Sequence, residues 1–235
     1  MMDEKITGSL ALRVHTWTVR ILLFIMIIEC LLLIVEEQWL SALMVFLTIA
    51  IVITPEILSK RFDVTIPAEF QILVIVFVFA ALFLGEVRNF YARFWWWDLL
   101  LHASSGLLLG MVGFLLVYVL NEHKRIDFHM QPRFVALFAF VFAVAAGALW
   151  EIFEFGMDQI FGTNMQKPMF GDPSGLTDTM WDLIVDALGA CAISTFGWWY
   201  MKKGQPSFVE NWIQKFIDKN QRFFSRKKSI RKSRV

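Results

Sequence analysis

The chain has 235 residues, of which 57% are hydrophobic and 18% are charged, and its mean hydropathy is +0.58. A water-soluble domain of this length carries more charge, so the composition excludes an ordinary soluble enzyme and indicates a protein that has the lipid bilayer as its solvent. The net charge is only +1, because 22 Lys and Arg balance 21 Asp and Glu, so the position of each charge is more informative than the sum.

Six apolar segments are long enough to cross a hydrocarbon layer about 30 Å thick. They cover residues 14–35, 39–58, 67–85, 97–120, 133–157 and 180–201. The first segment lacks the small-residue cleavage site of a signal peptide, and a second span follows at once, so we expect the first to be retained. The sequence therefore predicts an all-α, polytopic membrane bundle of about six transmembrane helices within residues 1–202.

Basic residues mark one side of the membrane. Lys and Arg are concentrated in the N-terminal segment, in the loops after the second and fourth spans, and in the C-terminal tail. The positive-inside rule makes these segments cytoplasmic. Tryptophan agrees, because residues 95–97 fall at the resulting outer boundary, and Trp198 and Trp199 fall at the inner one. We therefore expect both termini to be cytoplasmic.

Residues 203–235 form a predicted cytoplasmic tail. Ser207 and Glu210 have the spacing of a capping box, and hydrophobic residues recur at helical intervals as far as Phe224. The helix runs into RKKSIRKSR, which has six bases in nine residues. We expect an amphipathic, basic C-terminal helix that lies on anionic lipid, each base contributing about 1 kcal/mol. An arm that binds nucleic acid is the less favoured interpretation.

Ionisable residues interrupt the last three spans, and such residues in a membrane indicate a functional site by default. Helical periodicity groups them on three faces. These faces carry Asp98 and His102 in the fourth span, Glu151, Glu154 and Asp158 in the fifth, and Asp178, Asp182 and Asp186 in the sixth. The predicted topology places all three faces near the outer surface, because the fourth and sixth spans begin there and the fifth ends there. The groups can therefore meet.

Small residues continue the same three faces toward the inner side, as expected for helices that approach closely. They are Gly106, Gly110, Ala143, Gly147 and Ala190. We infer that the helices pack through these small residues and that the polar groups line a cavity at the outer end. Glu29 in the first span is a further candidate for this cavity.

Few bases are available in the outer half to balance these carboxylates, whereas a bound cation would balance them. Clustered carboxylates with one imidazole suit a divalent ion, and Zn, Mn, Mg and Ca are the candidates. The predicted metal ligands are His102, Glu151, Glu154, Asp182 and Asp186. The predicted general base is Asp158 or Asp178.

Structural interpretations compete with this one. Asp98 and Asp178 stand at helix N-termini, where a carboxylate caps free amides and is favoured by the helix dipole. Asp182 and Asp186 could be protonated and hydrogen-bonded to nearby serines. Capping cannot explain Glu151, because the fifth span ends there and the dipole disfavours an anion at that end.

Three motifs together resemble the YjdF-type bacterial inner-membrane proteins, with VanZ-like membrane proteins as more distant relatives. The motifs are the aromatic-Asp-x-x-x-His opening that ends at His102, the Glu-x-x-Glu pair that begins at Glu151, and the three aspartates spaced by four that begin at Asp178. The resemblance covers roughly residues 70–200. It implies a multi-pass protein of the bacterial cytoplasmic (inner) membrane and points to the same acidic residues, but it implies no reaction.

Three functions fit this sequence. The leading hypothesis is a metal-dependent hydrolase or transferase that acts on a lipid-linked or phosphorylated substrate at the outer leaflet. The second is a cation- or proton-coupled transporter that uses the carboxylates as a relay. The third is a structural or partner-binding membrane protein in which the acidic cluster fixes the packing of the helices. The sequence leaves the substrate, the oligomeric state and the identity of the metal open.

Overall fold

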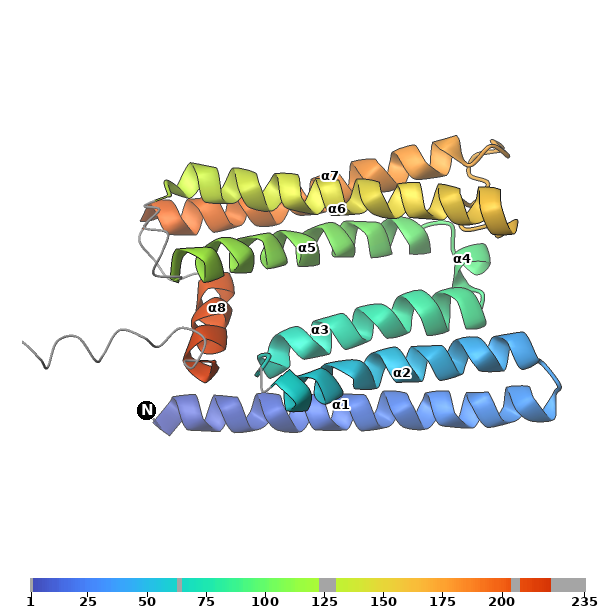
Figure 1. Ribbon diagram of the computed structural model, residues 1–235, viewed down its shortest axis with the longest axis horizontal. Coiled ribbons are helices and arrows are strands. Elements are labelled where there is room, and N and C mark those ends of the chain that lie inside the picture. The colour runs from blue at the N-terminus through green and yellow to red at the C-terminus, as the bar shows by residue number, and fades with distance from the viewer. Residues whose placement is uncertain (1, 63–64, 123–129, 204–207, 221–235) are drawn as a thin grey trace, which may run out of the picture. The chain divides into compact units, whose positions relative to one another are not determined.

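The computed structural model describes residues 2–62, 65–122, 130–203 and 208–220 (Figure 1). Its elements in chain order are α1 (Met2–Val35), α2 (Trp39–Phe62), α3 (Ala68–Val78), the π-helix η1 (Phe79–Val87), α4 (Phe90–Arg93), α5 (Trp97–Glu122), α6 (Pro132–Phe161), α7 (Leu176–Lys203) and α8 (Phe208–Lys219). Apart from one isolated bridge between Met169 and Asp172, these described residues form no β-structure. The predicted all-α class is confirmed.

Six helical segments are long and apolar enough to cross a membrane. They are Leu12–Val35, Trp39–Ile57, Ala68–Val87, Trp97–Tyr118, Pro132–Phe161 and Leu176–Lys203. The third segment is α3 continued by η1, so one span combines two kinds of helix. The number of spans and their positions agree with the hydropathy pattern, and the protein is a polytopic helical membrane protein.

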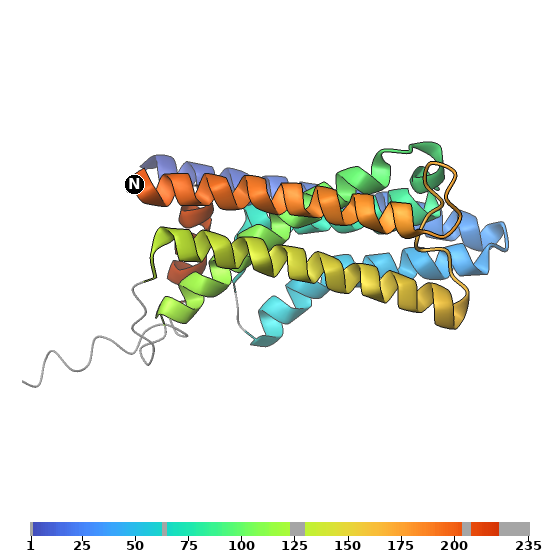
Figure 2. The ribbon, with the colours of Figure 1, turned by 90° about the horizontal axis from the view of Figure 1, so that it is seen from above.

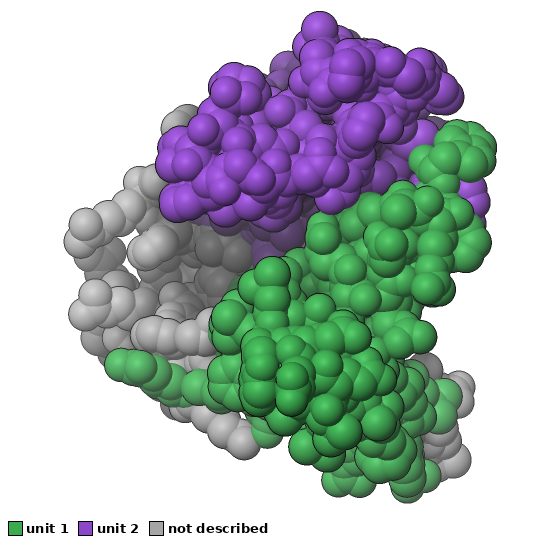
Figure 3. All heavy atoms as spheres, turned by 90° about the vertical axis from the view of Figure 1, so that its right-hand side faces the viewer, with its two compact units in different colours: residues 1–95, 214–235 green, residues 96–213 purple. Residues whose placement is uncertain are grey.

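The chain divides into two compact units, which Figure 3 draws in different colours. Unit 1 consists of residues 1–95 and 214–235, and unit 2 consists of residues 96–213. The expected separation between a bundle of residues 1–202 and a tail of residues 203–235 stays a prediction.

Unit 1 is built on α1, α2, α3 and η1, which share one apolar core. The core residues are Met26, Leu33, Ala42, Val45, Val52, Ile75 and Phe83. Glu29 of α1 forms an ion pair with Arg88, with 2.7 Å between Glu29 Oε1 and Arg88 Nη1. Glu29 therefore has a partner within unit 1, and the structure gives it a role in the packing of that unit.

The C-terminal part of α8 contacts the start of α3 within unit 1. Lys215 Nζ lies 2.6 Å from Glu69 Oε1. Asn220 is buried, accepts a hydrogen bond from the amide of Thr65 at 2.7 Å and donates one to the Thr65 carbonyl. The predicted helix in the tail is present. The basic stretch at residues 226–234, the capping residue Ser207 and the anionic-lipid contact predicted for them lie outside the described residues.

Unit 2 contains α5, α6 and α7, which pack against one another and alternate in direction (Figures 1 and 2). The starts of α5 and α7 therefore lie at the same end of unit 2 as the end of α6. Pro132 occupies the first turn of α6, where its missing amide hydrogen is tolerated, and Gly162 ends the helix in the left-handed conformation at φ 64°. The helix α6 ends at Phe161, four residues beyond the predicted span of residues 133–157.

Glycines bring α5 very close to α7. A Cβ atom on Gly106 would collide with the backbone carbonyl of Asp186, and one on Gly189 would collide with the carbonyl of Ala103. Gly147 of α6 faces the Asp186 carboxylate in the same way. The small-residue contact predicted from the sequence is present, and it lies directly beside the acidic residues.

We expect Gly106→Ala to lower the stability of the protein by about 1–3 kcal/mol, because the added methyl group forces the backbones of α5 and α7 apart. Gly156→Ala is the matched control, because a Cβ atom at Gly156 meets no atom within 4 Å. The measurement is the midpoint of thermal unfolding in detergent, followed by tryptophan fluorescence. Equal midpoints for the two variants would contradict the close packing described here.

Candidate metal centre

Acidic residues from three helices meet at one end of unit 2. His102 comes from α5, Glu151 from α6, and Asp182 and Asp186 from α7. The buried members of this cluster are His102, Glu151, Glu154, Asp178, Asp182 and Asp186. The fold thus brings together residues up to 84 positions apart, as the alternating topology predicted.

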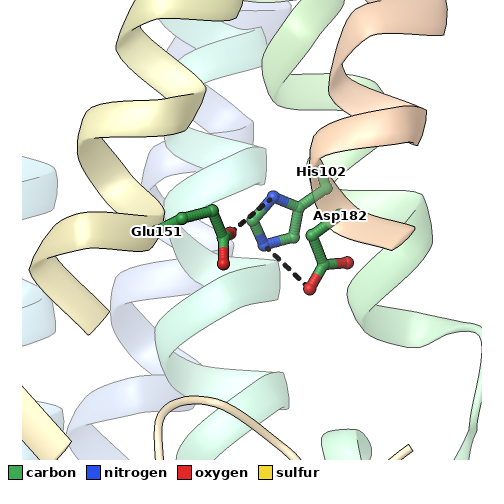
Figure 4. Close-up of side chains that lie close together, drawn as sticks. All are labelled: His102, Glu151 and Asp182. Atoms are coloured by element: carbon green, nitrogen blue, oxygen red, sulfur yellow. Dashed lines mark ion pairs between the residues drawn. The ribbon is translucent and has the colours of Figure 1, made fainter. Parts of the chain in front are cut away.

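His102 lies at the centre of the cluster, and each ring nitrogen faces two carboxylates. Nδ1 lies 3.2 Å from Asp186 Oδ2 and 3.8 Å from Glu151 Oε1. Nε2 lies 3.7 Å from Asp98 Oδ1 and 3.9 Å from Asp182 Oδ2. Figure 4 shows the imidazole between Glu151 and Asp182.

Asp186 fixes the orientation of this imidazole. Its Oδ2 is within hydrogen-bonding distance of His102 Nδ1, and its Oδ1 accepts a hydrogen bond from Ser105 Oγ. Because a carboxylate accepts, Nδ1 is the donor in this contact, and Nε2 would be the ring nitrogen available to a metal ion. A carboxylate behind a histidine is the usual arrangement that orients a metal-binding imidazole. Asp186, which the sequence suggested as a ligand, is placed as the partner of His102.

Glu151 and Asp182 have a different environment. Their exposed fractions are 3% and 0%, and among the described residues none of their four carboxylate oxygens has a hydrogen-bond partner. Leaving a buried polar group unsatisfied costs about 1–3 kcal/mol, and more for a charged one. Buried polar atoms are rarely left without partners in native proteins, so these four oxygens indicate a partner of another kind.

His102, Glu151 and Asp182 form a geometric group suited to a metal ion. Each offers one ligand atom, and the three atoms lie within 4.8 Å of one another. Four-coordinate zinc with bonds of about 2.0–2.2 Å has its ligands roughly 3.4 Å apart, so small rotations of these side chains would bring them into place. One imidazole nitrogen with carboxylate oxygens suits Zn²⁺ or Mn²⁺.

Asp98, Asp178 and Asp182 form a second group within the same distance limit. Asp178 is 1% exposed, and its Oδ2 accepts a hydrogen bond from the amide of Lys167 at 2.7 Å. The sequence had assigned Asp98 and Asp178 in large part to helix capping. The structure adds a contact for each: Asp98 faces the imidazole of His102, and Asp178 binds a loop amide.

Glu154 is buried one turn beyond Glu151, and Trp150 Nε1 donates a hydrogen bond to its Oε1 at 2.8 Å. Neither of the two groups found among the described residues includes Glu154. As a predicted ligand it therefore lies next to the centre, with an indole as its partner.

Asp158 organises the loop that follows α6. Its Oδ1 accepts hydrogen bonds from Thr163 Oγ1 and the amide of Met165, and its Oδ2 accepts one from the amide of Gln166. Both oxygens are therefore occupied by the loop. This contact places Asp158, one of the two predicted general bases, as the anchor of residues 163–166.

The sequence reasoning missed Asp172, which fixes the turn into α7. Its Oδ1 accepts the amide of Ser174, and its Oδ2 accepts the amide and the hydroxyl of Thr177. Hydrogen bonds from Ser174 and Thr177 hold the pKa of the Asp172 carboxyl below its usual range. The Asp-Pro-Ser-Gly sequence that begins at Asp172 is a turn signal that could have revealed this role.

The fold and the cluster define the protein as a polytopic helical membrane protein with a buried acidic centre. The profile of the family described as "Predicted membrane protein (DUF2238)" matches residues 17–203, so the chain belongs to this family. The matched residues include the whole cluster from Asp98 to Asp186. Membership agrees with the resemblance inferred from the motifs.

An uncharacterized protein of Thermotoga maritima is 31% identical to this chain over 136 residues. The match covers 58% of this chain and 65% of the relative, so this chain spans slightly less than two thirds of the length of that protein. No solved structure has significant similarity to the chain.

Replacing Asp158 by Ala should speed amide exchange of Met165 and Gln166 by roughly tenfold, because the two amides lose a charged acceptor. Asp172→Ala is the matched control, since it should release the amides of Ser174 and Thr177 and leave those of Met165 and Gln166 unchanged. Hydrogen–deuterium exchange with mass spectrometry distinguishes the two segments. Identical exchange in both variants would refute the loop-anchoring role of Asp158.

Proposed function

We propose that the protein is a divalent-metal-dependent hydrolase or transferase that acts on a lipid-linked or phosphorylated substrate. Its place would be the bacterial cytoplasmic membrane, with the centre near the outer face. The observation that carries the proposal is the pair Glu151 and Asp182, whose carboxylates are buried beside His102 and accept no hydrogen bond from the described residues.

The charge balance supports a cation. An ionised carboxylate in the middle of a membrane costs about 2.5–3.5 kcal/mol on insertion scales, and this cluster contains several. The ion pairs that the structure records for Glu151 and Asp182 are both with His102, at distances beyond a hydrogen bond. One imidazole cannot balance this many carboxylates, whereas a divalent ion between Glu151 and Asp182 would contact both.

A purely structural role explains part of the cluster but not its centre. Asp186 does hold α5 and α7 together, because it bonds both Ser105 and His102. Within the part of the chain that the structure describes, Glu151 and Asp182 have no such hydrogen bonds. A pair of apolar residues of similar volume would pack helices at less cost. The centre therefore fits a binding site better than a packing device.

Transport is less well supported than catalysis. Beyond Asp186, Ile193 fills the space beside Gly110, and Phe114 fills the space beside Gly197. These apolar contacts close the interface between α5 and α7 toward the other side of the membrane, where a conduction path would need polar groups. Ser194 is buried there and its hydroxyl has no hydrogen-bond partner among the described residues, which is an observation in favour of a path.

The residues divide into roles that suit phosphoryl or lipid-linked substrates. His102, Glu151 and Asp182 would hold the ion, which when bound polarises an oxygen of the substrate and promotes ionisation of water. Asp186 would keep the imidazole in position. In a hydrolysis, water forms the new bond to phosphorus, the bond to the leaving group breaks, and Asp178 is the better placed of the two predicted bases to take the proton, because the loop occupies Asp158.

Metal analysis of the detergent-purified protein tests the proposal. We expect wild-type protein loaded with Mn²⁺ to retain stoichiometric metal by inductively coupled plasma mass spectrometry, and the His102→Ala, Glu151→Gln double variant to lose the ion that these two residues would hold. At a free Mn²⁺ concentration of 100 times the Kd, binding should stabilise the wild type by about 2.7 kcal/mol, seen as a higher unfolding temperature. Release of phosphate from lipid phosphates should depend on the same ion.

The variant Glu151→Gln separates the three functions. With metal removed, it should unfold at the wild-type temperature or higher, because an unpartnered charge has become neutral, whereas a structural role predicts a lower temperature. Ion flux in proteoliposomes that is lost in the variant, without phosphate release by the wild type, would favour transport. Absence of metal from the wild type even after loading would reject the metalloenzyme.

Asp186→Asn should weaken Mn²⁺ binding by about 10–100-fold without changing the number of ions at saturation, because the variant disturbs the orientation of His102 and removes no ligand. Ser104→Ala is the control, since the hydroxyl of Ser104 donates to the carbonyl of Leu100 in its own helix. Isothermal titration calorimetry gives both the affinity and the number of sites. A lower number of sites in Asp186→Asn would identify Asp186 as a ligand instead.

A further inference from the structure

Asp182 belongs to two groups of potential ligands at once. One group is Asp182 with His102 and Glu151, and the other is Asp182 with Asp98 and Asp178. We infer that the centre holds two divalent cations, the second between Asp98 and Asp178, with Asp182 as the shared ligand. This inference rests on the proposed function, which it extends from one ion to two.

The inference depends on the burial and the missing hydrogen-bond partners of the Asp182 carboxylate among the described residues. The Asp182 side chain is fully buried, it points toward His102 (Figure 4), and neither of its oxygens has a hydrogen-bond partner among the described residues. A carboxylate that bridges two ions uses one oxygen for each. Asp186, one turn further along α7, has both oxygens engaged by Ser105 and His102, so the two aspartates differ in the property that a bridge requires.

The imidazole of His102 places Asp98 on the same side as the shared residue Asp182. Nδ1 faces Asp186 and Glu151, whereas Nε2 faces Asp182 and Asp98. The Asp98 carboxylate is thus directed into the cluster at 3.7 Å from Nε2, in addition to its place in the first turn of α5. Its position fits a ligand that lies beside the first ion.

The two groups differ in chemistry and therefore in preferred ion. The group with His102 contains a nitrogen donor, whereas Asp98, Asp178 and Asp182 supply only oxygen, which suits Mg²⁺, Mn²⁺ or Ca²⁺. A second divalent ion would also balance more of the six carboxylates in the cluster, which are Asp98, Glu151, Glu154, Asp178, Asp182 and Asp186. In this arrangement Asp178 is a ligand and not the general base.

A pair of ions narrows the substrate class. Two ions about 3.5–4 Å apart stabilise both the attacking and the leaving oxygen of a displacement at phosphorus. The substrate is therefore a phosphate ester or a diphosphate, in preference to a lipid without phosphorus. The amide of Lys167 bonds Asp178, so the loop anchored by Asp158 lies next to the second ion.

The test counts Mn²⁺ ions in the full-length, detergent-purified protein and records their electron paramagnetic resonance. We expect two ions for the wild type and one each for Asp98→Asn and Glu151→Gln. The wild type at saturation should give the multiline signal of two exchange-coupled ions, and Asp98→Asn the six-line signal of a single ion. Glu37→Gln, which removes an exposed carboxylate from unit 1, should retain two coupled ions.

Each contrary result has a distinct meaning. One ion in the wild type, unaffected by Asp98→Asn but lost in Glu151→Gln, overturns the second position and leaves the proposed function standing. No ion in any protein overturns both. Two ions with only uncoupled signals overturn the shared role of Asp182. Unfolding midpoints identify a variant that fails to fold. If Asp98→Asn does not fold, Asp178→Asn replaces it. The wild-type spectrum shows independently of any variant whether two coupled ions are bound.

Discussion

The close approach of α5 and α7 is the constraint on which the rest of unit 2 depends. Gly106 and Gly189 allow each backbone to touch the other, so the N-terminal halves of the two helices are held side by side. His102 is then within 4 Å of Asp182 and Asp186 without any loop to position it. Rigid helices hold a site more accurately than loops do, which is why small residues and ionisable residues alternate along the same faces.

The centre combines satisfied and unsatisfied carboxylates, and the difference between them suggests a division of roles. Asp186 is bonded on both oxygens and supports the imidazole, as a partner behind a metal ligand does. Glu151 and Asp182 are equally buried but bond nothing among the described residues. A fully satisfied cluster would indicate packing alone, and a fully unsatisfied one would not hold its geometry. The mixture agrees with the cation-binding centre that we propose.

The loop between α6 and α7 is ordered by aspartates as well. Asp158 accepts hydrogen bonds from the amides of residues 165 and 166, and Asp172 accepts one from the amide of Thr177 at the start of α7. Asp178 accepts a hydrogen bond from the amide of Lys167. The first two form local contacts that any exposed loop can use, since both lie outside the cluster. The third joins the loop to the buried centre. In the proposed function, a cation in the centre would therefore be linked to this loop through Asp178 and the amide of Lys167.

The sequence alone determined the class of the protein, because the bilayer imposes the length and hydrophobicity of each span. It also determined which faces of the last three spans meet, because helical periodicity and alternating direction fix the depth of the ionisable residues in the membrane. It could not assign roles within the cluster. Asp182 and Asp186 are identical in type and one turn apart, and only tertiary contacts with Ser105 and His102 distinguish the supporting residue from the unpartnered one. Likewise, Asp158 lies on the same predicted helix face as Glu151. The chain turns after Gly162, however, and loop amides bond the carboxylate of Asp158. Pairing across helices depends on side-chain distances of a few ångströms, and those distances are set by packing, which no local pattern encodes.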